Sequence, residues 1–188
     1  MIWKRNPQQA CVTMIDQNTL DMMTGDMCDM GGMITFLKFN QAVEREARSR
    51  RKALLPYYGP ADFVLREGKV WTPARLPRNI RAGELGHCFK NAFELALRHK
   101  LTYVEGYASD LVPVPHAWCC DEEGRVVDNT WREPEHCSYF GVAFDPEYVK
   151  RTVMEQQFYE LIDQPATGWP LITGRHMDWR HRRWSRAA

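Results

Sequence analysis

The chain has 188 residues, enough for one domain of ordinary size with its own hydrophobic core. Hydrophobic residues make up 44% and charged residues 26%, close to the soluble globular average, which argues against a disordered or membrane-embedded chain. The 25 basic and 24 acidic residues leave a formal net charge of +1, so the whole-chain charge does not favour nucleic acid or anionic lipid.

Neither a secretory signal nor a membrane span is visible. The positive charges at Lys4 and Arg5 precede no apolar segment, and no later run approaches the ~18 apolar residues of a span. We therefore expect a cytoplasmic protein with no membrane partner. The six cysteines include the neighbours Cys119 and Cys120, and a chain of this length needs no disulfide framework, so we expect reduced thiols.

The first 33 residues are rich in methionine and aspartate. Asp21, Asp26 and Asp29 lack the alternating Asp-x-Asp-x-Asp-Gly order of a calcium loop. We interpret residues 20–33 as a flexible apolar flap or a methionine-filled packing surface rather than a metal site.

The segment from residue 34 to residue 81 contains mixed signals. Alternation in Ile34–Phe39 predicts a strand, and Asn40 is expected to cap a helix that runs to about Leu55. Proline and glycine then interrupt the pattern, and short loop and strand pieces are expected near Phe63–Leu65 and Val70–Thr72. Two further prolines predict irregular structure up to residue 81.

The pattern becomes clearer at Cys88. Apolar residues recur at helical spacing and predict a helix from Cys88 to about His99. Gly86 ends the segment before this helix, so Cys88 is expected at or next to its N-terminus. Strands are then expected at residues 101–108, 116–121, 125–131 and 139–144. Residues 122–124 form a short turn that makes the second and third of these strands a hairpin.

A last helix is expected after Asp145, an N-cap residue followed by a first-turn proline. Its expected buried face comprises Val149, Val153, Phe158, Leu161 and Ile162. Helices outside a run of antiparallel strands indicate the α+β class.

Three residues in this region have the chemistry of a nucleophilic site. Cys88 is expected at a helix N-terminus, where the macrodipole and unpaired N–H groups favour thiolate and can also stabilise an oxyanion. His116 lies seven residues before Glu123 and Asp128 five after it, so the hairpin is expected to bring them nearly opposite each other. Asp128 would then orient the imidazole, as in a catalytic triad.

These motifs carry a resemblance to a known superfamily. Cys88 at a helix start, His-Ala-Trp at residues 116–118 and Asp-Asn-Thr at residues 128–130 resemble the core of the transglutaminase-like, papain-related cysteine enzymes. The resemblance covers residues 86–131 and implies a helix-borne Cys packed on an antiparallel sheet that supplies His and Asp. It also implies a protease, deamidase or transglutaminase type of activity on an amide or acyl bond, with no cofactor.

The sequence also departs from members of that superfamily. The papain branch carries a glutamine shortly before its Cys and an Asn as third residue, and neither is present here, so the transglutaminase-like branch is nearer. Arylamine acyltransferases approach the Cys through Arg-Gly-Gly, whereas this chain has Glu-Leu-Gly-His at 84–87. The candidates for oxyanion or substrate contacts are His87, Asn91, Tyr103, Trp118 and Asn129.

Each of these residues also has a structural interpretation. A free Cys is often a small hydrophobic residue of the core, and a His beside a Trp is often packed within a strand. An Asp-Asn pair often forms a turn through its side-chain hydrogen bonds. A zinc site is a further alternative, but no Cys-x-x-Cys pair occurs and strand alternation sends His116 and Cys119 to opposite faces. We therefore expect no metal.

The C-terminal residues 175–188 combine five arginines with Trp179 and Trp184. Arginine and stacking aromatics are typical of nucleic-acid contacts, although a solvated tail whose tryptophans pack on the domain is favoured here.

We expect one domain over residues 1–188, with an accessory region at 1–80, a catalytic core at 81–165 and the basic, aromatic tail at 166–188. The favoured function is a cysteine hydrolase or acyltransferase acting on a protein, peptide or small amide substrate. The alternative is a non-catalytic binding protein that uses the tail for nucleic acid or a protein partner.

Overall fold

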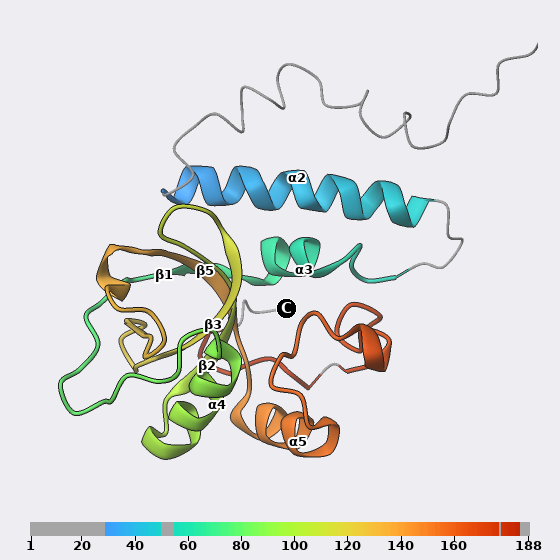
Figure 1. Ribbon diagram of the computed structural model, residues 1–188. Coiled ribbons are helices and arrows are strands. Elements are labelled where there is room, and N and C mark those ends of the chain that lie inside the picture. The colour runs from blue at the N-terminus through green and yellow to red at the C-terminus, as the bar shows by residue number, and fades with distance from the viewer. Residues whose placement is uncertain (1–28, 50–54, 177, 185–188) are drawn as a thin grey trace, which may run out of the picture.

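A five-stranded antiparallel sheet lies at the centre of the computed structural model, which describes residues 29–49, 55–176 and 178–184 (Figure 1). The strand order is β1-β5-β2-β3-β4, and every pairing between neighbours is antiparallel. The strands are β1 (Lys69–Trp71), β2 (Thr102–Ser109), β3 (Val114–Cys120), β4 (Val126–Val127) and β5 (Ser138–Ala143).

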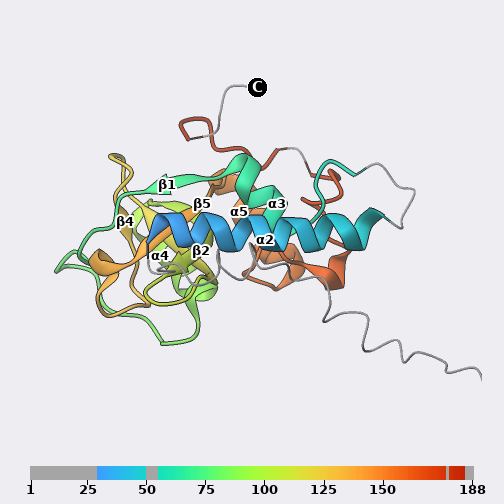
Figure 2. The same cartoon turned by 90° about the horizontal axis from the view of Figure 1, so that it is seen from above.

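In the part of the chain that the structure describes, four α-helices and two short 3-10 helices surround the sheet. The α-helices are α2 (Met30–Ser49), α3 (Pro60–Glu67), α4 (Cys88–His99) and α5 (Pro146–Gln156), and the 3-10 helices are η2 (Pro134–His136) and η3 (Pro165–Thr167). In Figure 1, α2 runs above α3, while α4 and α5 lie on the opposite side of the molecule. Figure 2 shows α2 from above, crossing the molecule beside α3.

The two faces of the sheet have different coverings. Tyr103, Cys119 and Val142 belong to the larger core, to which all four α-helices contribute buried residues. Trp118 and Tyr139 belong to a smaller core on the other face, completed by loop residues and by the C-terminal segment. The arrangement confirms the α+β class expected from the sequence.

Local structure from Cys88 onward follows the sequence closely. The helix predicted from Cys88 to His99 is α4, and the predicted strands correspond to β2, β3, β4 and β5. Gly124 ends the hairpin turn with φ of 79°, a conformation that favours glycine. Asp145 caps α5 by accepting hydrogen bonds from the N–H groups of Glu147 and Tyr148.

One predicted strand and the last predicted helix extend beyond the observed elements. The strand expected at 125–131 is reduced to the two residues of β4, and the chain turns away at Asp128. The face expected for the last helix is also divided, because α5 ends at Gln156. Val149 and Val153 are buried on it, whereas Leu161 and Ile162 are buried in the segment that follows and Phe158 is 54% exposed.

The strand predicted at Ile34–Phe39 is wrong, because these residues lie inside α2. Met33 and Leu37 are fully buried and Met30 and Ile34 pack beside them, which is helical spacing. The alternating pattern of Ile34–Phe39 resembles a strand only when Met30 and Met33, which extend the buried face of the helix, are left out. Asp29 belongs to the start of this helix, since its Oδ1 accepts a hydrogen bond from the Gly32 N–H.

The helix predicted to begin at Asn40 in fact begins earlier, at Met30. Asn40 lies in the middle of α2 rather than at its cap. The described residues of α2 run to Ser49, and the predicted end near Leu55 follows residues 50–54, which lie outside the described residues. The methionine-rich packing surface is observed for Met30 and Met33. Asp21 and Asp26 lie outside the described residues, as does most of the segment interpreted as a flap.

Phe63–Leu65 was expected in loop or strand and lies in α3 instead. Pro60 occupies the first turn of this helix, where its missing N–H costs nothing, so it begins the helix rather than breaking the pattern. The Glu44 side chain of α2 caps α3 by accepting hydrogen bonds from the N–H groups of Ala61 and Asp62. This cap comes from a distant residue and leaves no local signal. Val70, by contrast, lies in β1 as predicted.

The tryptophans of the C-terminal segment pack on the domain. Trp179 is buried against Phe63, with ring centroids 5.0 Å apart. Trp184 packs edge-on against Trp71, and the Lys69 Nζ lies 3.9 Å from its ring centroid. The folding back of both rings was the favoured interpretation of the sequence, and it occupies the surfaces that stacking on bases would need.

None of the helices in the described part of the chain is long and apolar enough to cross a membrane. Cys88, Cys119, Cys120 and Cys137 are free thiols, as expected.

Candidate active site

Cys88 is the first residue of α4 and lies where that helix meets β3. Its side chain is 9% exposed. The backbone N–H groups of Phe89 and Ala117 hydrogen-bond to its sulfur, and so does the side chain of His116. The sulfur therefore accepts hydrogen bonds from a helix N-terminus and from a strand edge at the same time.

The short β4 explains how the thiol reaches β3. β4 pairs with β3 only at Cys119 and Cys120. It therefore does not cover β3 at His116 and Ala117, and α4 places Cys88 at this point. A longer β4 would occupy the edge from which the Ala117 N–H reaches the sulfur.

His116 and Asp128 form a buried pair beside the thiol. The His116 Nε2 donates to the Asp128 Oδ2 over 2.8 Å. The two side chains are 2% and 1% exposed. Because Nε2 is held by the carboxylate, Nδ1 is the ring nitrogen left for Cys88. The structure thus brings the three sequence-predicted residues together.

The geometry of this pair follows the predicted hairpin. Cys119 pairs with Val127, so the register is centred on Glu123, as predicted, and its continuation by one residue puts Asp128 opposite Trp118. His116 and Trp118 lie on the same face of β3. Asp128 therefore reaches the imidazole diagonally from the residue just after β4, across the two-residue offset that the spacing already contained.

Donors around Asp128 fix its orientation. Its Oδ1 accepts the Thr130 N–H at 2.8 Å and lies 3.5 Å from the Trp131 nitrogen. The Tyr139 hydroxyl donates to Oδ2 over 3.0 Å. Both carboxylate oxygens are therefore directed by neighbouring groups, which leaves Oδ2 facing the imidazole.

The electrostatics favour a thiolate and an imidazolium. Burial raises the pKa of the Cys88 thiol, but the hydrogen bond and charge of His116, aided by two backbone N–H groups, outweigh it and lower the pKa below the ordinary 9.0. Burial likewise lowers the pKa of His116, but Asp128 and Cys88 outweigh it and raise the pKa to about 9. The arrangement therefore shifts the pair toward thiolate and imidazolium, which makes the sulfur a better nucleophile.

Aromatic rings enclose the imidazole. The Trp131 ring centroid lies 4.5 Å from that of His116, and the Trp118 ring lies 6.3 Å away in a stacked orientation. These rings exclude water from the hydrogen bond between His116 and Asp128, which strengthens it.

Three of the remaining candidates are held by other contacts. Asn91 is buried, and its Nδ2 donates to the Glu84 carbonyl and the Thr130 Oγ1, so it ties the loop before α4 to the loop after β4. The Tyr103 hydroxyl lies 3.1 Å from a Glu105 oxygen and 3.0 Å from the Tyr159 carbonyl. Trp118 is fully buried in the smaller core.

The other two candidates lie near the site without a described catalytic contact. His87 immediately precedes α4, and its Nε2 lies 3.5 Å from a Glu84 oxygen on an exposed surface. The backbone carbonyl of Asn129 accepts the Gly83 N–H over 2.6 Å. These contacts give Asn91 and Asn129 a role in holding the loops around Cys88 and Asp128.

Sequence reasoning missed the Ala117 N–H, Trp131 and Tyr139 as parts of the site. A backbone donor carries no sequence signal, and its direction depends on where β4 ends. Tyr139 was assigned to a strand, but its contact with Asp128 joins β5 to the loop after β4, which no local pattern shows.

The alternative zinc ligands are separated. Cys119 faces α4, where its thiol donates to the Ala92 carbonyl, while His116 faces the smaller core with Trp118, as alternation predicted. Over residues 29–49, 55–176 and 178–184, no three His, Cys, Asp or Glu side chains are placed to hold a metal ion.

Comparison of the sequence with family models finds no matching family, and comparisons with curated proteins and with solved structures find no match. The geometry around Cys88 is therefore the feature that indicates a function.

Proposed function

We propose that this protein is a cysteine hydrolase or acyltransferase that acts on an amide or related acyl bond. The observation that carries the proposal is the contact of Cys88 with His116 and of His116 with Asp128, which lowers the pKa of the thiol and favours the thiolate. We also propose a transglutaminase-like core, because a helix that begins at the Cys packs on an antiparallel sheet that supplies the His and is followed by the Asp.

The reaction begins with attack of the Cys88 thiolate on the carbonyl carbon of the substrate. The carbonyl oxygen becomes an oxyanion, which backbone N–H groups at the start of α4 stabilise. The His116 Nδ1–H then protonates the leaving amine or alcohol as the carbon–heteroatom bond breaks. The product of this half-reaction is a thioester on Cys88 and a neutral His116.

The second half-reaction reverses the roles. Neutral His116 removes a proton from water or from an amine, whose oxygen or nitrogen attacks the thioester carbon. The carbon–sulfur bond breaks, and the thiolate and the imidazolium are restored. Water gives a protease or deamidase, and an amine gives a transferase. Asp128 keeps the ring oriented and stabilises its charged form throughout.

Selective alkylation tests the reactive thiol. Iodoacetamide near neutral pH, followed by peptide mass spectrometry, is expected to modify Cys88 first, with Cys119, Cys120 and Cys137 as internal controls. Burial raises the pKa of each of these three thiols above the ordinary value. Slow labelling of all four thiols at similar rates would contradict a reactive Cys88 and favour a non-catalytic binding protein.

A substrate panel tests the reaction. Peptide, glutamine-amide and acyl-ester compounds are incubated with the wild-type chain and with Cys88→Ala, and intact mass spectrometry detects the thioester. An acyl adduct that forms only on the wild-type chain supports the proposal, and free acid or amine adduct among the products separates hydrolysis from transfer. Turnover retained by Cys88→Ala would refute it.

A further inference from the structure

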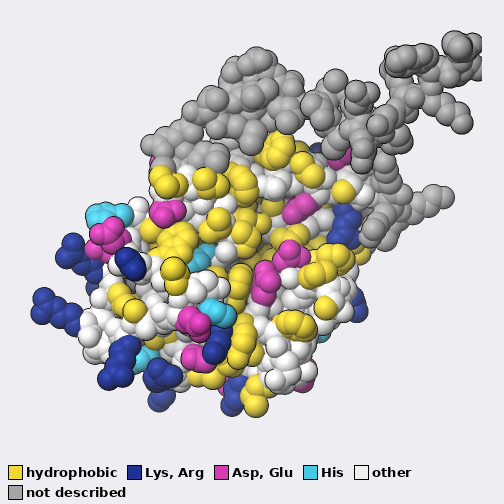
Figure 3. Space-filling model, viewed as in Figure 1, with side chains coloured by type: hydrophobic (Ala, Val, Ile, Leu, Met, Phe, Trp, Pro, Cys, Tyr) yellow, Lys and Arg dark blue, Asp and Glu magenta, His cyan; other side chains and the backbone are white. Residues whose placement is uncertain are grey.

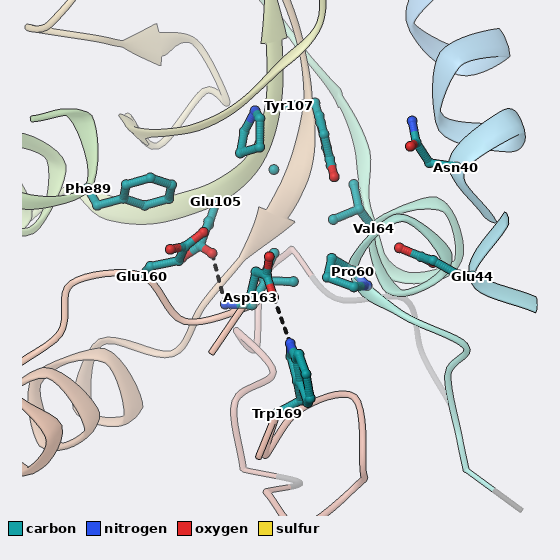
Figure 4. Close-up of a pocket in the computed structure, with 13 residues that line it drawn as sticks. Asn40, Glu44, Pro60, Val64, Phe89, Glu105, Tyr107, Glu160, Asp163 and Trp169 are labelled. Atoms are coloured by element: carbon teal, nitrogen blue, oxygen red, sulfur yellow. Dashed lines mark hydrogen bonds between the residues drawn. The ribbon is translucent and has the colours of Figure 1, made fainter. Parts of the chain in front are cut away.

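A cavity of about 230 Å³ is lined by residues next in the chain to Cys88 and His116, although these two side chains do not line it themselves (Figure 4). Phe89, which follows Cys88, and Pro115, which precedes His116, both line it. So does Gly106, which pairs with His116 in the register of β2 and β3. Phe89 and Tyr107 pack on the larger core, on the face of the sheet that α4 covers. A substrate group that extends from the start of α4 along this face can therefore reach the cavity.

Aromatic rings and carboxylates together form its walls. The rings are those of Phe89, Tyr107 and Trp169, and the carboxylates are those of Glu44, Glu105, Glu160 and Asp163. Among the described residues that line the cavity there is no Lys, Arg or His. Figure 3 shows acidic side chains around a hollow with hydrophobic walls near the middle of this face, whereas most basic side chains lie toward its margins.

Neutral donors hold three of the four carboxylates in place. Glu105 is buried and accepts the N–H groups of Leu161 and Ile162, each over 2.8 Å. Asp163 accepts the Trp169 indole N–H over 2.6 Å, and Glu44 accepts two N–H groups of α3. These donors orient the carboxylates. Burial raises the pKa of Glu105 to about 8, so near neutral pH the negative charge of the cavity comes mainly from the other carboxylates.

Glu160 is the carboxylate with the fewest partners. It is half-buried, and no hydrogen bond or ion pair of its carboxylate is found in the described part of the chain. Burial and, to a smaller extent, Asp163 raise its pKa to about 7. In Figure 4 it lies on the wall that also carries Glu105, formed by β2 and the segment after α5.

The negative charges also converge on one point of the cavity. Burial raises the pKa of Tyr107, and the carboxylates of Glu44, Asp163, Glu160 and Glu105 raise it further. The four carboxyl groups are thus close enough to act on one phenol, and the described cavity lining has no cation to offset them. A positively charged group at this point would be attracted by the ionised carboxylates and would favour ionisation of Glu105 and Glu160.

We propose that this cavity binds a cationic organic group of the substrate, an alkylammonium or a guanidinium, while the acyl group reaches Cys88. The proposal deepens the proposed function and rests on it. Aromatic rings beside carboxylates suit such a group, because the faces of the rings attract cations and their edges pack on its aliphatic part. The group is either a basic side chain next to the acyl carbon or an amine that accepts the acyl group.

Binding is tested first without catalysis. Calorimetry on Cys88→Ala compares N-acetyl-arginine amide with N-acetyl-citrulline amide, which has a similar shape without the charge. We expect the arginine compound to bind at least about tenfold more tightly. The difference is expected to shrink as salt is raised. Equal affinity for the two compounds, or no detectable binding of either, overturns the inference.

Variants then assign the preference to the cavity. Glu160→Gln is expected to remove most of the preference for arginine over citrulline, because it removes the charge that has no partner. Asp163→Asn keeps an acceptor for Trp169 and is expected to weaken the preference as well. Glu155→Gln, an exposed acid of α5 outside the cavity, is the matched control and should retain the preference. Thermal unfolding checks that each variant folds, and an unchanged preference in both folded cavity variants contradicts the inference.

Turnover separates the two sources of the cation. A wild-type chain that acylates faster with the arginine ester than with the citrulline ester supports a basic side chain. Saturable acylation of butylamine that weakens in Glu160→Gln supports an amine acceptor. Acylation at equal rates with the arginine and citrulline esters, together with butylamine transfer unaffected by Glu160→Gln, overturns the inference but leaves the proposed function standing. Cation binding by a chain that forms no thioester with any donor instead refutes the proposed function.

Discussion

Two buried thiols contact α4 at points one turn apart along the helix and have opposite properties. Cys88 opens the helix, whereas Cys119 lies on β3 and donates its thiol hydrogen to the carbonyl of Ala92, four residues into the helix. Burial acts on both in the same direction. Yet the pKa of Cys88 is lowered, and that of Cys119 is raised well above its ordinary value by burial and then by the charges of Cys120 and Asp128.

The difference lies in what each sulfur contacts. Cys88 accepts hydrogen bonds from backbone N–H groups and from a positively charged imidazole, and these favour the thiolate. Cys119 faces a carbonyl oxygen, which favours the neutral thiol. Burial alone does not decide reactivity, because the polarity of the surrounding groups can reverse its effect.

Removing each sulfur gives the largest expected contrast. Cys88→Ala should reduce turnover of an accepted acyl substrate by about 10⁴-fold or more, because no other group can form the thioester. Cys119→Ala should change turnover only a few-fold and lower the free energy of unfolding by about 1 kcal/mol through the lost packing. Steady-state kinetics and urea unfolding measure the two effects. A large loss of turnover in Cys119→Ala with an unchanged fold would break the comparison.

Replacing the imidazole should make Cys88 resemble Cys119. In His116→Gln the charge that opposes burial is removed, so the pKa of Cys88 should rise toward or above its ordinary value. Alkylation of Cys88 at neutral pH should then fall by about 10²-fold, because less thiolate is present. The rate at Cys119 is the internal control and should not change. Rapid alkylation that persists in the variant would show that His116 does not activate the thiol.

The pH dependence follows from the two pKa shifts. The thiolate forms as pH rises through the lowered pKa of Cys88, and His116 loses its proton near pH 9. Turnover should therefore rise, level off and fall by about tenfold for each pH unit above 9 as the proton for the leaving group is lost. His116 binds its proton more tightly in the folded chain, so its stabilising contribution is present below the unfolded pKa near 6.5 and disappears as pH rises through about 9. Turnover and urea unfolding between pH 5 and 10, in wild type and His116→Gln, measure both effects.

The sequence predicted most accurately where local pattern and tertiary environment agree. Cys88 to His99 forms a helix with the predicted bounds, since its apolar spacing also faces the larger core. The predicted helix start and hairpin were enough to predict that the thiol, the imidazole and the carboxylate meet. Ile34–Phe39 failed because β-forming residues were placed in a helix by contacts of its methionine-bearing stripe.

Other features of the site depend on contacts that no local pattern contains. The end of β4 after Val127 frees the strand edge at Ala117 and places Asp128 just beyond the strand in which it was predicted. The acidic cavity joins Glu44 of α2 with Glu160 and Asp163 of a loop more than a hundred residues later. Such groups approach only when the chain folds, so their charges could be counted from the sequence but not placed.

The contact between Tyr139 and Asp128 gives the smallest expected effect. Tyr139→Phe removes one of the two donors to the Asp128 Oδ2 and leaves the His116 hydrogen bond in place. The carboxylate should be less firmly oriented, so turnover should fall about threefold to tenfold and the free energy of unfolding by about 1 kcal/mol. With one donor lost, the remaining charge on Oδ2 should bind the imidazolium more strongly and move the alkaline limb of the pH profile upward. Tyr148→Phe, a buried tyrosine of α5 distant from Asp128 in the chain, is the matched control and should leave that limb unchanged. A shift in both variants would assign the effect to general destabilisation, whereas a shift in Tyr139→Phe alone assigns it to the carboxylate that holds His116.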